Sequence, residues 1–294
     1  MSGRAVVGIV GLGLVGQALA SRLLAAGFEV VGYDLRPEAR AAFGGEAVNS
    51  VRAVGQRADC VVLAVFDSKD VMDVVEGADG LLADGHQVQT VIDCSTGDPA
   101  LLAALAGRLA ERGVAFIEGP LSGSSQQIAA GEATQLLGGD EAAIGSCSTV
   151  LQALASKRIH VGPAGSAASA KLATNLVLGL NRAALAEGMV FAESLGIAPD
   201  KFLALVLATP ARSGAAEAKG EMMVRGDFAP QSRIRQHLKD VELMLANAQQ
   251  SGQRLPLSEA HVALMRDAID AGDGDLDNAG LIRQFRRLRR PGKN

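Results

Sequence analysis

Aromatic side chains are scarce in this chain of 294 residues, which has no tryptophan, one tyrosine and eight phenylalanines. Proteins that bind single-stranded nucleic acid stack its bases on aromatic rings, and phosphate binding requires an excess of basic residues. Here 32 Asp and Glu residues stand against 28 Lys and Arg residues, which gives a formal net charge of −4. The composition therefore argues against a nucleic-acid partner.

Cysteine is also rare, and Cys60, Cys94 and Cys147 lie far apart in no metal-ligand spacing. We expect no metal site, and buried, reduced thiols in a reducing compartment. The sequence has no stretch of about 18 uninterrupted apolar residues, so no membrane contact is expected. Residues 5–21 resemble a signal peptide, but the spacing of the glycines within them favours a folded, glycine-rich turn instead. The expected location is the cytoplasm.

Strand-like and helix-like segments alternate in the first half of the chain. Short segments rich in Val or Ile and bounded by turn residues predict strands. They lie at residues 5–10, 29–33, 60–65, 90–93 and 114–117, with further strands expected at 134–137 and 158–161. Ala- and Leu-rich segments between them have helical spacing. This alternation predicts a Rossmann-type, doubly wound parallel α/β sheet.

The pattern changes after residue 161, where Gly162, Pro163 and Gly165 interrupt the chain. From residue 166 to about 195 the sequence favours one helix, which would be about 45 Å long at 1.5 Å per residue. Further helices are expected at residues 199–208, 233–251, 258–271 and 278–288. We therefore predict a dinucleotide-binding domain at residues 1–164 and an all-helical substrate and dimerisation domain at residues 165–294, joined by the long helix.

Three glycines, Gly11, Gly13 and Gly16, form a G-x-G-x-x-G motif directly after the first predicted strand and before a predicted helix. In this context they permit a tight turn, close approach to a pyrophosphate and close packing of helix and strand. Asp34 follows the second strand, where a carboxylate accepts hydrogen bonds from a ribose hydroxyl and repels a 2′-phosphate. This favours NAD, although Arg36 could host the extra phosphate of NADP.

Lys171 is the only charged residue between His160 and Arg182, in a segment dominated by Ala, Leu and Val. Asn175 follows on the same helical face. A lysine on a buried helix loses hydration and becomes easier to deprotonate, as a general acid/base requires. The local pattern alone is equally compatible with a solvated surface lysine.

Two further segments contain candidate polar groups. Residues 119–125 form a small-residue loop after a strand, where successive backbone N–H groups and the Ser122 hydroxyl could hold a carboxylate or could form an ordinary flexible turn. Lys239 and Asp240 lie within a predicted helix, and without other context they would be a solvated charge pair.

These motifs together resemble those of the β-hydroxyacid dehydrogenases, such as 3-hydroxyisobutyrate dehydrogenase, tartronate semialdehyde reductase and the glyoxylate/succinic semialdehyde reductases. The resemblance extends from residue 7 to about residue 251. It rests on the glycine motif, on Asp93-Cys94-Ser95-Thr96 with Pro99, on Glu118-Gly119-Pro120-Leu121-Ser122-Gly123-Ser124, on Gly162, Gly165, Lys171 and Asn175, and on Lys239-Asp240. The third segment is normally closer to D-A-P-V-S-G-G, so Ser124 stands where the family usually has a second glycine.

The residues and the resemblance together predict a role for each candidate. Lys171 would be the proton donor and acceptor at the substrate hydroxyl. Substrate contacts would come from Ser122, Gly123, Ser124, Asn175 and Lys239. Cofactor contacts would come from Gly11, Leu12, Gly13, Leu14, Val15, Gly16, Asp34, Leu35, Arg36, Val65, Thr96 and Lys239.

The predicted reaction is hydride transfer between NAD, or NADP, and a small carboxylate-bearing 3-hydroxy acid or its semialdehyde. An imine reductase on the same architecture is an alternative, although those proteins generally lack a lysine at the position of Lys171. A non-catalytic dinucleotide-binding module is a second alternative, and a sugar-phosphate dehydrogenase is disfavoured by the length of the chain. A homodimer or homotetramer is expected, because a long apolar helix needs more cover than a small helical domain provides.

Overall fold

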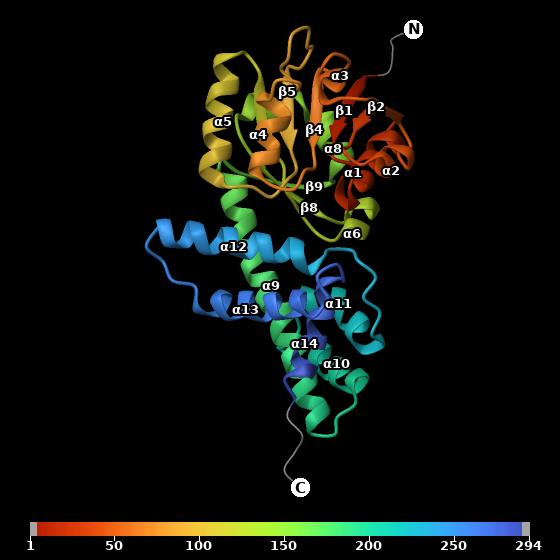
Figure 1. Ribbon diagram of the computed structural model, residues 1–294, viewed down its shortest axis with the longest axis vertical. Helices are drawn as coiled ribbons and strands as arrows, with labels where there is room; N and C mark the ends of the chain where they lie inside the picture. Colours follow the sequence, from red (N-terminus) through yellow and green to blue (C-terminus); the bar gives the residue numbers. More distant parts are fainter. Residues whose placement is uncertain (1–4, 290–294) are drawn as a thin grey trace. The chain divides into compact units, whose positions relative to one another are not determined.

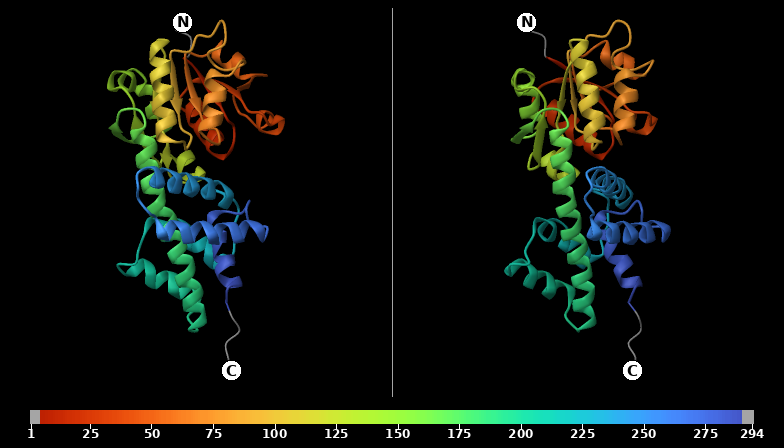
Figure 2. Two further views of the ribbon diagram at one scale, coloured as in Figure 1. Left: turned by 60° about the vertical axis from the view of Figure 1, so that its left-hand side comes forward. Right: turned by 90° about the vertical axis from the view of Figure 1, so that its left-hand side faces the viewer.

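A computed structural model of the chain describes residues 5–289, so the first four and last five residues of the two predicted domains lie outside the described residues. The chain separates into two units, Met1–Lys171 and Leu172–Asn294. This division falls inside helix α9 (Ser166–Ser194), which Figure 2 shows as one unbroken helix. The predicted domain boundary at residue 164 stays a prediction.

The first unit is built on a mixed sheet whose strands follow the order β3-β2-β1-β4-β5-β6-β8-β7, with β9 paired to β8 (Figure 1). The strands are β1 (Val6–Val10), β2 (Glu29–Tyr33), β3 (Glu46–Ala47), β4 (Cys60–Leu63), β5 (Thr90–Asp93), β6 (Ala115–Glu118), β7 (Leu121–Ser122), β8 (Thr134–Gly138) and β9 (Lys157–Gly162). From β3 to β6 all neighbours are parallel. This confirms the predicted Rossmann-type sheet, whose strand order changes direction beside β1.

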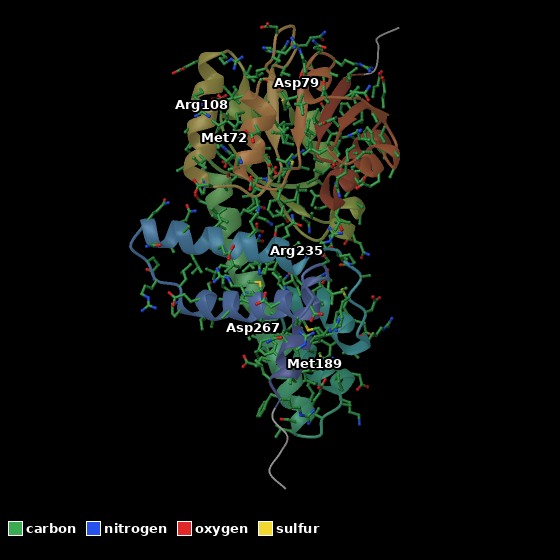
Figure 3. All side chains as sticks on the ribbon, viewed as in Figure 1. Met72, Asp79, Arg108, Met189, Arg235 and Asp267 are labelled. Carbon is green, nitrogen blue, oxygen red and sulfur yellow. The ribbon has the colours of Figure 1, made fainter. Side chains whose placement is uncertain are left out.

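Helices cover both faces of this sheet because alternate strand residues point to opposite sides. Val62 and Ile92 pack in one core with α1 and α8, whereas Val61 and Val91 pack in another with α4 and α5. The exposed Arg108 side chain, labelled in Figure 3, pairs across this second face with Glu76 of α4. The helices are α1 (Leu14–Ala25), α2 (Pro37–Ala41), α3 (Val51–Gly55), α4 (Ser68–Glu76), α5 (Pro99–Glu111), α6 (Ser125–Ala130), α7 (Glu141–Ser146) and α8 (Ser148–Leu154).

Strand β8 departs from the expected parallel pairing. It runs antiparallel to β6 and to β7, and parallel to β9. The contact with β6 is a single pair, Glu118 with Gly138. The segment that connects β6 to β8 contains only the short strand β7 and the short helix α6.

The named elements of the second unit are all helices among its described residues, apart from an isolated β-bridge between Arg233 and Asp277. It consists of the remainder of α9 with α10 (Pro199–Ala208), α11 (Gly214–Arg225), α12 (Ile234–Gln250), α13 (Pro256–Asp270), the 3-10 helix η1 (Asn278–Leu281) and α14 (Ile282–Arg287). Met189 of α9, labelled in Figure 3, lies fully buried in the common core of these helices. Gly179 lets α12 approach closely, because a Cβ there would lie 2.4 Å from His237 Nε2. The predicted all-helical region is confirmed, and α11 was not predicted.

Candidate active site

The glycine-rich turn between β1 and α1 depends on close backbone contacts. Gly11 has φ of +93°, which favours glycine, and a Cβ there would lie 2.3 Å from the Ala64 carbonyl oxygen. A Cβ on Gly16 would lie 1.8 Å from the Gly11 oxygen, whereas a Cβ on Gly13 would make only an ordinary van der Waals contact, 3.7 Å from Arg36 Nη2. Helix α1 then begins at Leu14 without a side-chain cap and without an acidic residue in its first turn. Its first N–H groups and dipole suit a pyrophosphate.

Asp34 lies at the end of β2 with a side chain that is only 9% exposed. Its Oδ2 accepts a hydrogen bond from the Leu12 backbone N–H at 2.7 Å, so the glycine-rich turn and this carboxylate are directly joined. Arg36 donates to the same carboxylate from its backbone N–H at 2.9 Å and from its guanidinium at 3.0 and 3.1 Å. Burial acts to raise the pKa of Asp34, but the hydrogen bonds from Arg36 and Leu12 outweigh it, so the pKa is lowered and the carboxylate is ionised near neutral pH.

Other predicted cofactor residues lie at neighbouring strand ends. Val65 packs beside Gly11, since its Cγ1 would lie 3.3 Å from a Cβ placed there. The Val65 backbone N–H donates to the Ser95 hydroxyl at 3.0 Å, which links the ends of β4 and β5. Thr96 follows directly and is half-buried, whereas Leu35 is 83% exposed. The structure therefore brings the glycine-rich turn, Asp34, Val65 and the end of β5 to one edge of the sheet.

Lys171 is buried, with 7% of its surface exposed. Its Nζ donates a hydrogen bond to the Leu121 carbonyl oxygen at 2.5 Å. Leu121 belongs to β7, and Ser122 and Gly123 follow it directly. The sequence left open whether this lysine is solvated, and in the structure it is not. Its amine therefore contacts the predicted substrate loop at residues 119–125, within the first unit.

Ser124, the residue that departs from the family pattern, caps helix α6. Its hydroxyl accepts the Gln127 backbone N–H at 3.3 Å, and the Gln127 side chain accepts the Ser124 backbone N–H at 2.8 Å. This reciprocal arrangement is a capping box. The N-cap role gives a physical reason for serine here, and the predicted substrate contact of Ser124 stays a prediction.

Asn175 and Lys239 meet at one carboxylate in the second unit. The Asn175 side-chain amide donates to Asp240 Oδ2 at 3.4 Å, and Lys239 Nζ lies 3.1 Å from Asp240 Oδ1. Asn175 and Asp240 are buried, and the Lys239 side chain is 19% exposed. Lys239 and Asp240 are therefore not the freely solvated pair that the local sequence allowed. Asn175 also follows Lys171 by about one turn of α9.

Glu118, at the end of β6, has a role that the sequence analysis missed. The residue is 1% exposed, and its carboxylate accepts backbone N–H groups of Gly165, Ala167 and Ala168 at the start of α9. Burial raises its pKa, although these three hydrogen bonds act in the opposite direction. A carboxylate directly before the predicted loop at residues 119–125 was the available signal, but the partners lie 47 to 50 residues away.

Within residues 5–289 no group of three or more His, Cys, Asp and Glu side chains could hold a metal ion. Within the same residues no helix is long and apolar enough to cross a membrane.

Comparisons with known proteins relate the whole described chain to one group of enzymes. Residues 6–162 match the family described as the NAD binding domain of 6-phosphogluconate dehydrogenase. Residues 165–285 match the family described as NAD-binding of NADP-dependent 3-hydroxyisobutyrate dehydrogenase. The chain is 33% identical to L-threonate dehydrogenase of Cupriavidus necator over 98% of both chains. It is 26% identical to 2-hydroxy-3-oxopropionate reductase of Escherichia coli over 94% of this chain and 95% of that one.

Solved structures agree with this relationship. A 3-hydroxyisobutyrate dehydrogenase from Salmonella typhimurium superimposes with a TM-score of 0.84 and 30% identity over 95% of this chain and 99% of that chain. An imine reductase from Pseudomonas sp. has a TM-score of 0.64 and 22% identity over 96% of this chain and 100% of that chain, which shows a shared fold alone.

Proposed function

The chain belongs to the 3-hydroxyisobutyrate dehydrogenase family of β-hydroxyacid dehydrogenases and is an NAD(P)-dependent oxidoreductase, and on that premise we propose that Lys171 is its proton-transfer residue. The proposed reaction is reversible hydride transfer between the nicotinamide cofactor and a small 3-hydroxy acid or its semialdehyde. The observation that carries this proposal is the burial of the Lys171 amine against the Leu121 carbonyl, directly before the turn at Ser122 and Gly123.

The amine of Lys171 acts on the substrate oxygen in this proposal. The nicotinamide, when bound, supplies the hydride chemistry. In the reducing direction Nζ donates a proton to the oxygen that becomes the hydroxyl, and in the oxidising direction it takes that proton back. A cation at this oxygen stabilises the developing alkoxide more than the ground-state carbonyl, and this difference lowers the barrier. The hydrogen bond to Leu121 holds the amine in position for this transfer.

The proposed substrate is small and bears a carboxylate. Related proteins named for L-threonate, 2-(hydroxymethyl)glutarate and 2-hydroxy-3-oxopropionate support this class. The backbone N–H groups after Leu121 and the Ser122 hydroxyl are suited to bind a carboxylate. We assign Ser122, Gly123, Ser124, Asn175 and Lys239 to substrate orientation, with Asp240 holding the last two side chains in fixed orientations.

We propose NAD as the preferred cofactor, with NADP as a second. Gly11, Gly13 and the first turn of α1 would hold the pyrophosphate, and Asp34 would hold the adenosine ribose. The ionised Asp34 carboxylate opposes a 2′-phosphate. Arg36 supports the second cofactor, because its side chain is 54% exposed and an ion pair at such a site is weak enough to open.

We also propose that the chain forms a homodimer or homotetramer in the cytoplasm. Apolar side chains on α9 and directly after its end are exposed: Val177 and Phe191 of α9 at 56% and 63%, and Leu195 at 62%. Exposed apolar surface of this kind is typical of an interface. Mass measurement by light scattering after size-exclusion chromatography would refute self-association if it gave the monomer mass of 30.1 kDa.

The deciding experiment replaces Lys171 with alanine. Steady-state rates with a panel of small semialdehydes and glyoxylate, each with NADH and NADPH, first identify the substrate. Turnover of the Lys171→Ala variant should then fall by roughly 10²- to 10⁴-fold, the usual contribution of acid/base catalysis. The dissociation constant for NADH, measured by fluorescence, should not change. Unchanged turnover would remove Lys171 from the mechanism.

The same panel separates the alternatives. Reduction of a cyclic imine faster than any semialdehyde would favour the imine reductase alternative. Binding of NADH without turnover of any compound would favour a non-catalytic dinucleotide-binding module.

A further inference from the structure

Glu118 is a buried carboxylate at the carboxyl end of β6. It lies in register with Asp93 at the end of β5, and each residue is 1% exposed. A buried charge is strongly unfavourable unless hydrogen-bond donors surround it. The backbone N–H groups that donate to the Glu118 carboxylate therefore show which segment this side chain holds in place.

All three donors come from the first turn of helix α9 and the residue before it. Glu118 Oε2 accepts the backbone N–H groups of Gly165 at 2.7 Å and Ala167 at 3.2 Å, and Oε1 accepts that of Ala168 at 3.3 Å. The first N–H groups of a helix have no partners within the helix, and the helix dipole favours a negative charge there. Glu118 thus caps α9 from a strand that lies far away in the sequence.

The neighbouring strand leaves space for this cap. Gly138 of β8 pairs with Glu118, and a Cβ at Gly138 would lie 2.3 Å from Glu118 Oε2 and 3.0 Å from the Ala167 nitrogen. Ala167 and Ala168 are buried as well, so the start of α9 packs firmly against the sheet.

Lys171 lies about one helical turn after the capped residues, and its amine bonds to Leu121. Leu121 in turn follows Glu118 by three residues. Two contacts therefore tie the segment 118–121 to the first turns of α9, one through the Glu118 carboxylate and one through the Lys171 amine. We propose that Glu118 is a positioning residue that fixes the axial and rotational placement of the first turns of α9, and thereby holds the Lys171 amine at the substrate loop.

This inference rests on the proposed catalytic role of Lys171. The test compares Glu118→Gln, which removes the charge, with Glu118→Asp, which keeps the charge on a side chain one methylene shorter. Turnover of Glu118→Gln should fall about 10- to 100-fold, as expected for a displaced catalytic group. The KM for NADH should stay unchanged, because the glycine-rich turn is built from other elements. Glu118→Asp should recover part of the lost turnover.

Hydrogen–deuterium exchange of the backbone N–H groups at residues 165–168 provides a readout that does not depend on activity. The N–H groups of Gly165, Ala167 and Ala168, which donate to Glu118, should exchange faster in Glu118→Gln than in the wild type. Asp140→Asn is the matched control, because the Asp140 carboxylate caps α7 through the Ala143 N–H and has no part in the site. It should leave both turnover and exchange at 165–168 unchanged.

The outcomes are distinct. Faster exchange at residues 165–168 of Glu118→Gln with unchanged turnover would overturn the positioning role. Lower turnover with unchanged exchange would also overturn it. So would lower turnover accompanied by an equal rise in the KM for NADH. If Glu118→Gln does not fold, the same criteria apply to Glu118→Asp against the wild type. Lys171→Ala, assayed in parallel, separates the two proposals. Unchanged turnover of Lys171→Ala would remove the catalytic assignment of Lys171. Loss of turnover in Lys171→Ala but not in Glu118→Gln would remove only the positioning role of Glu118.

Discussion

Replacing Asp277 with alanine should strongly destabilise the second unit, because this carboxylate is fully buried and accepts several hydrogen bonds. Its Oδ2 accepts Lys219 Nζ at 2.9 Å and the backbone N–H groups of Gln231 and Ser232 at 2.9 and 3.0 Å. Its Oδ1 accepts the Ala279 N–H at 3.0 Å. The variant removes all four acceptor contacts.

The expected magnitude follows from the charges that remain. Lys219 and Arg182 are 5% and 6% exposed. Burial lowers the pKa of Arg182 to about 10, and the nearby Asp277 charge opposes this shift. Without Asp277 both cations stay buried and lose their carboxylate. Removing one partner of a buried ion pair costs roughly 3–5 kcal/mol, which is a large share of the roughly 5–15 kcal/mol by which proteins are stable.

Urea unfolding followed by circular dichroism measures this loss. The midpoint of Asp277→Ala should fall by about 1–2.5 M for an m value of about 2–3 kcal/mol/M. Arg235→Ala is the control, because Arg235, labelled in Figure 3, pairs with Asp275 on the surface, where the two side chains are 50% and 72% exposed. Its midpoint should stay at the wild-type value. Equal midpoints for both variants would refute the assignment of Asp277 as a stabilising buried charge.

Three further predictions concern the cofactor site and pH. Gly16→Ala should weaken NADH binding by roughly 5- to 150-fold, since its Cβ would overlap the Gly11 oxygen and force the turn to move. An unchanged dissociation constant for NADH in a fluorescence titration would contradict this. Arg36→Ala should raise the ratio of kcat/KM with NADH to kcat/KM with NADPH, because the variant leaves the Asp34 carboxylate without the cation that a 2′-phosphate needs. A lower ratio would contradict this prediction. Burial, with a smaller contribution from a nearby buried arginine, lowers the pKa of His261 to about 4. The unfolded chain, with a histidine pKa of about 6.5, binds more protons between pH 6.5 and 4, so wild-type stability should fall by roughly 3 kcal/mol as the pH decreases through this window. The His261→Gln variant should lack that part of the slope in urea unfolding at several pH values, and parallel curves would refute the assignment.

Local patterns in the sequence were sufficient for most of the fold. The alternation of Val-rich strands with helices predicted β1, β2, β4, β5 and β6 to within a few residues, since buried parallel strands read as continuous apolar segments. Helix α11 was missed because it contains Gly214 and Gly220, which lower helix propensity. Gly220 is explained only by its close contact with Leu203, where a Cβ would lie 2.3 Å from a side-chain carbon.

The residues of the site also divide into those that the sequence could predict and those that it could not. Gly11, Gly13 and Gly16 could be predicted because the chemistry of the turn depends on spacing within a few residues. The carboxylates of Glu118 and Asp277 could not, because their partners lie up to 50 and 58 residues away in the sequence. Ser124 is intermediate, since its capping box with Gln127 is a local pattern, although the sequence prediction placed this residue among the substrate contacts.

The hydrogen bond from the Leu12 N–H to Asp34 has a consequence for engineering the cofactor preference. The carboxylate that would select the ribose also supports the turn that would hold the pyrophosphate. An enzyme redesigned by removing Asp34 alone would therefore lose affinity for both dinucleotides rather than exchange one for the other. Redesign that keeps Asp34 and alters the guanidinium beside it separates recognition of the adenosine end from the integrity of the turn.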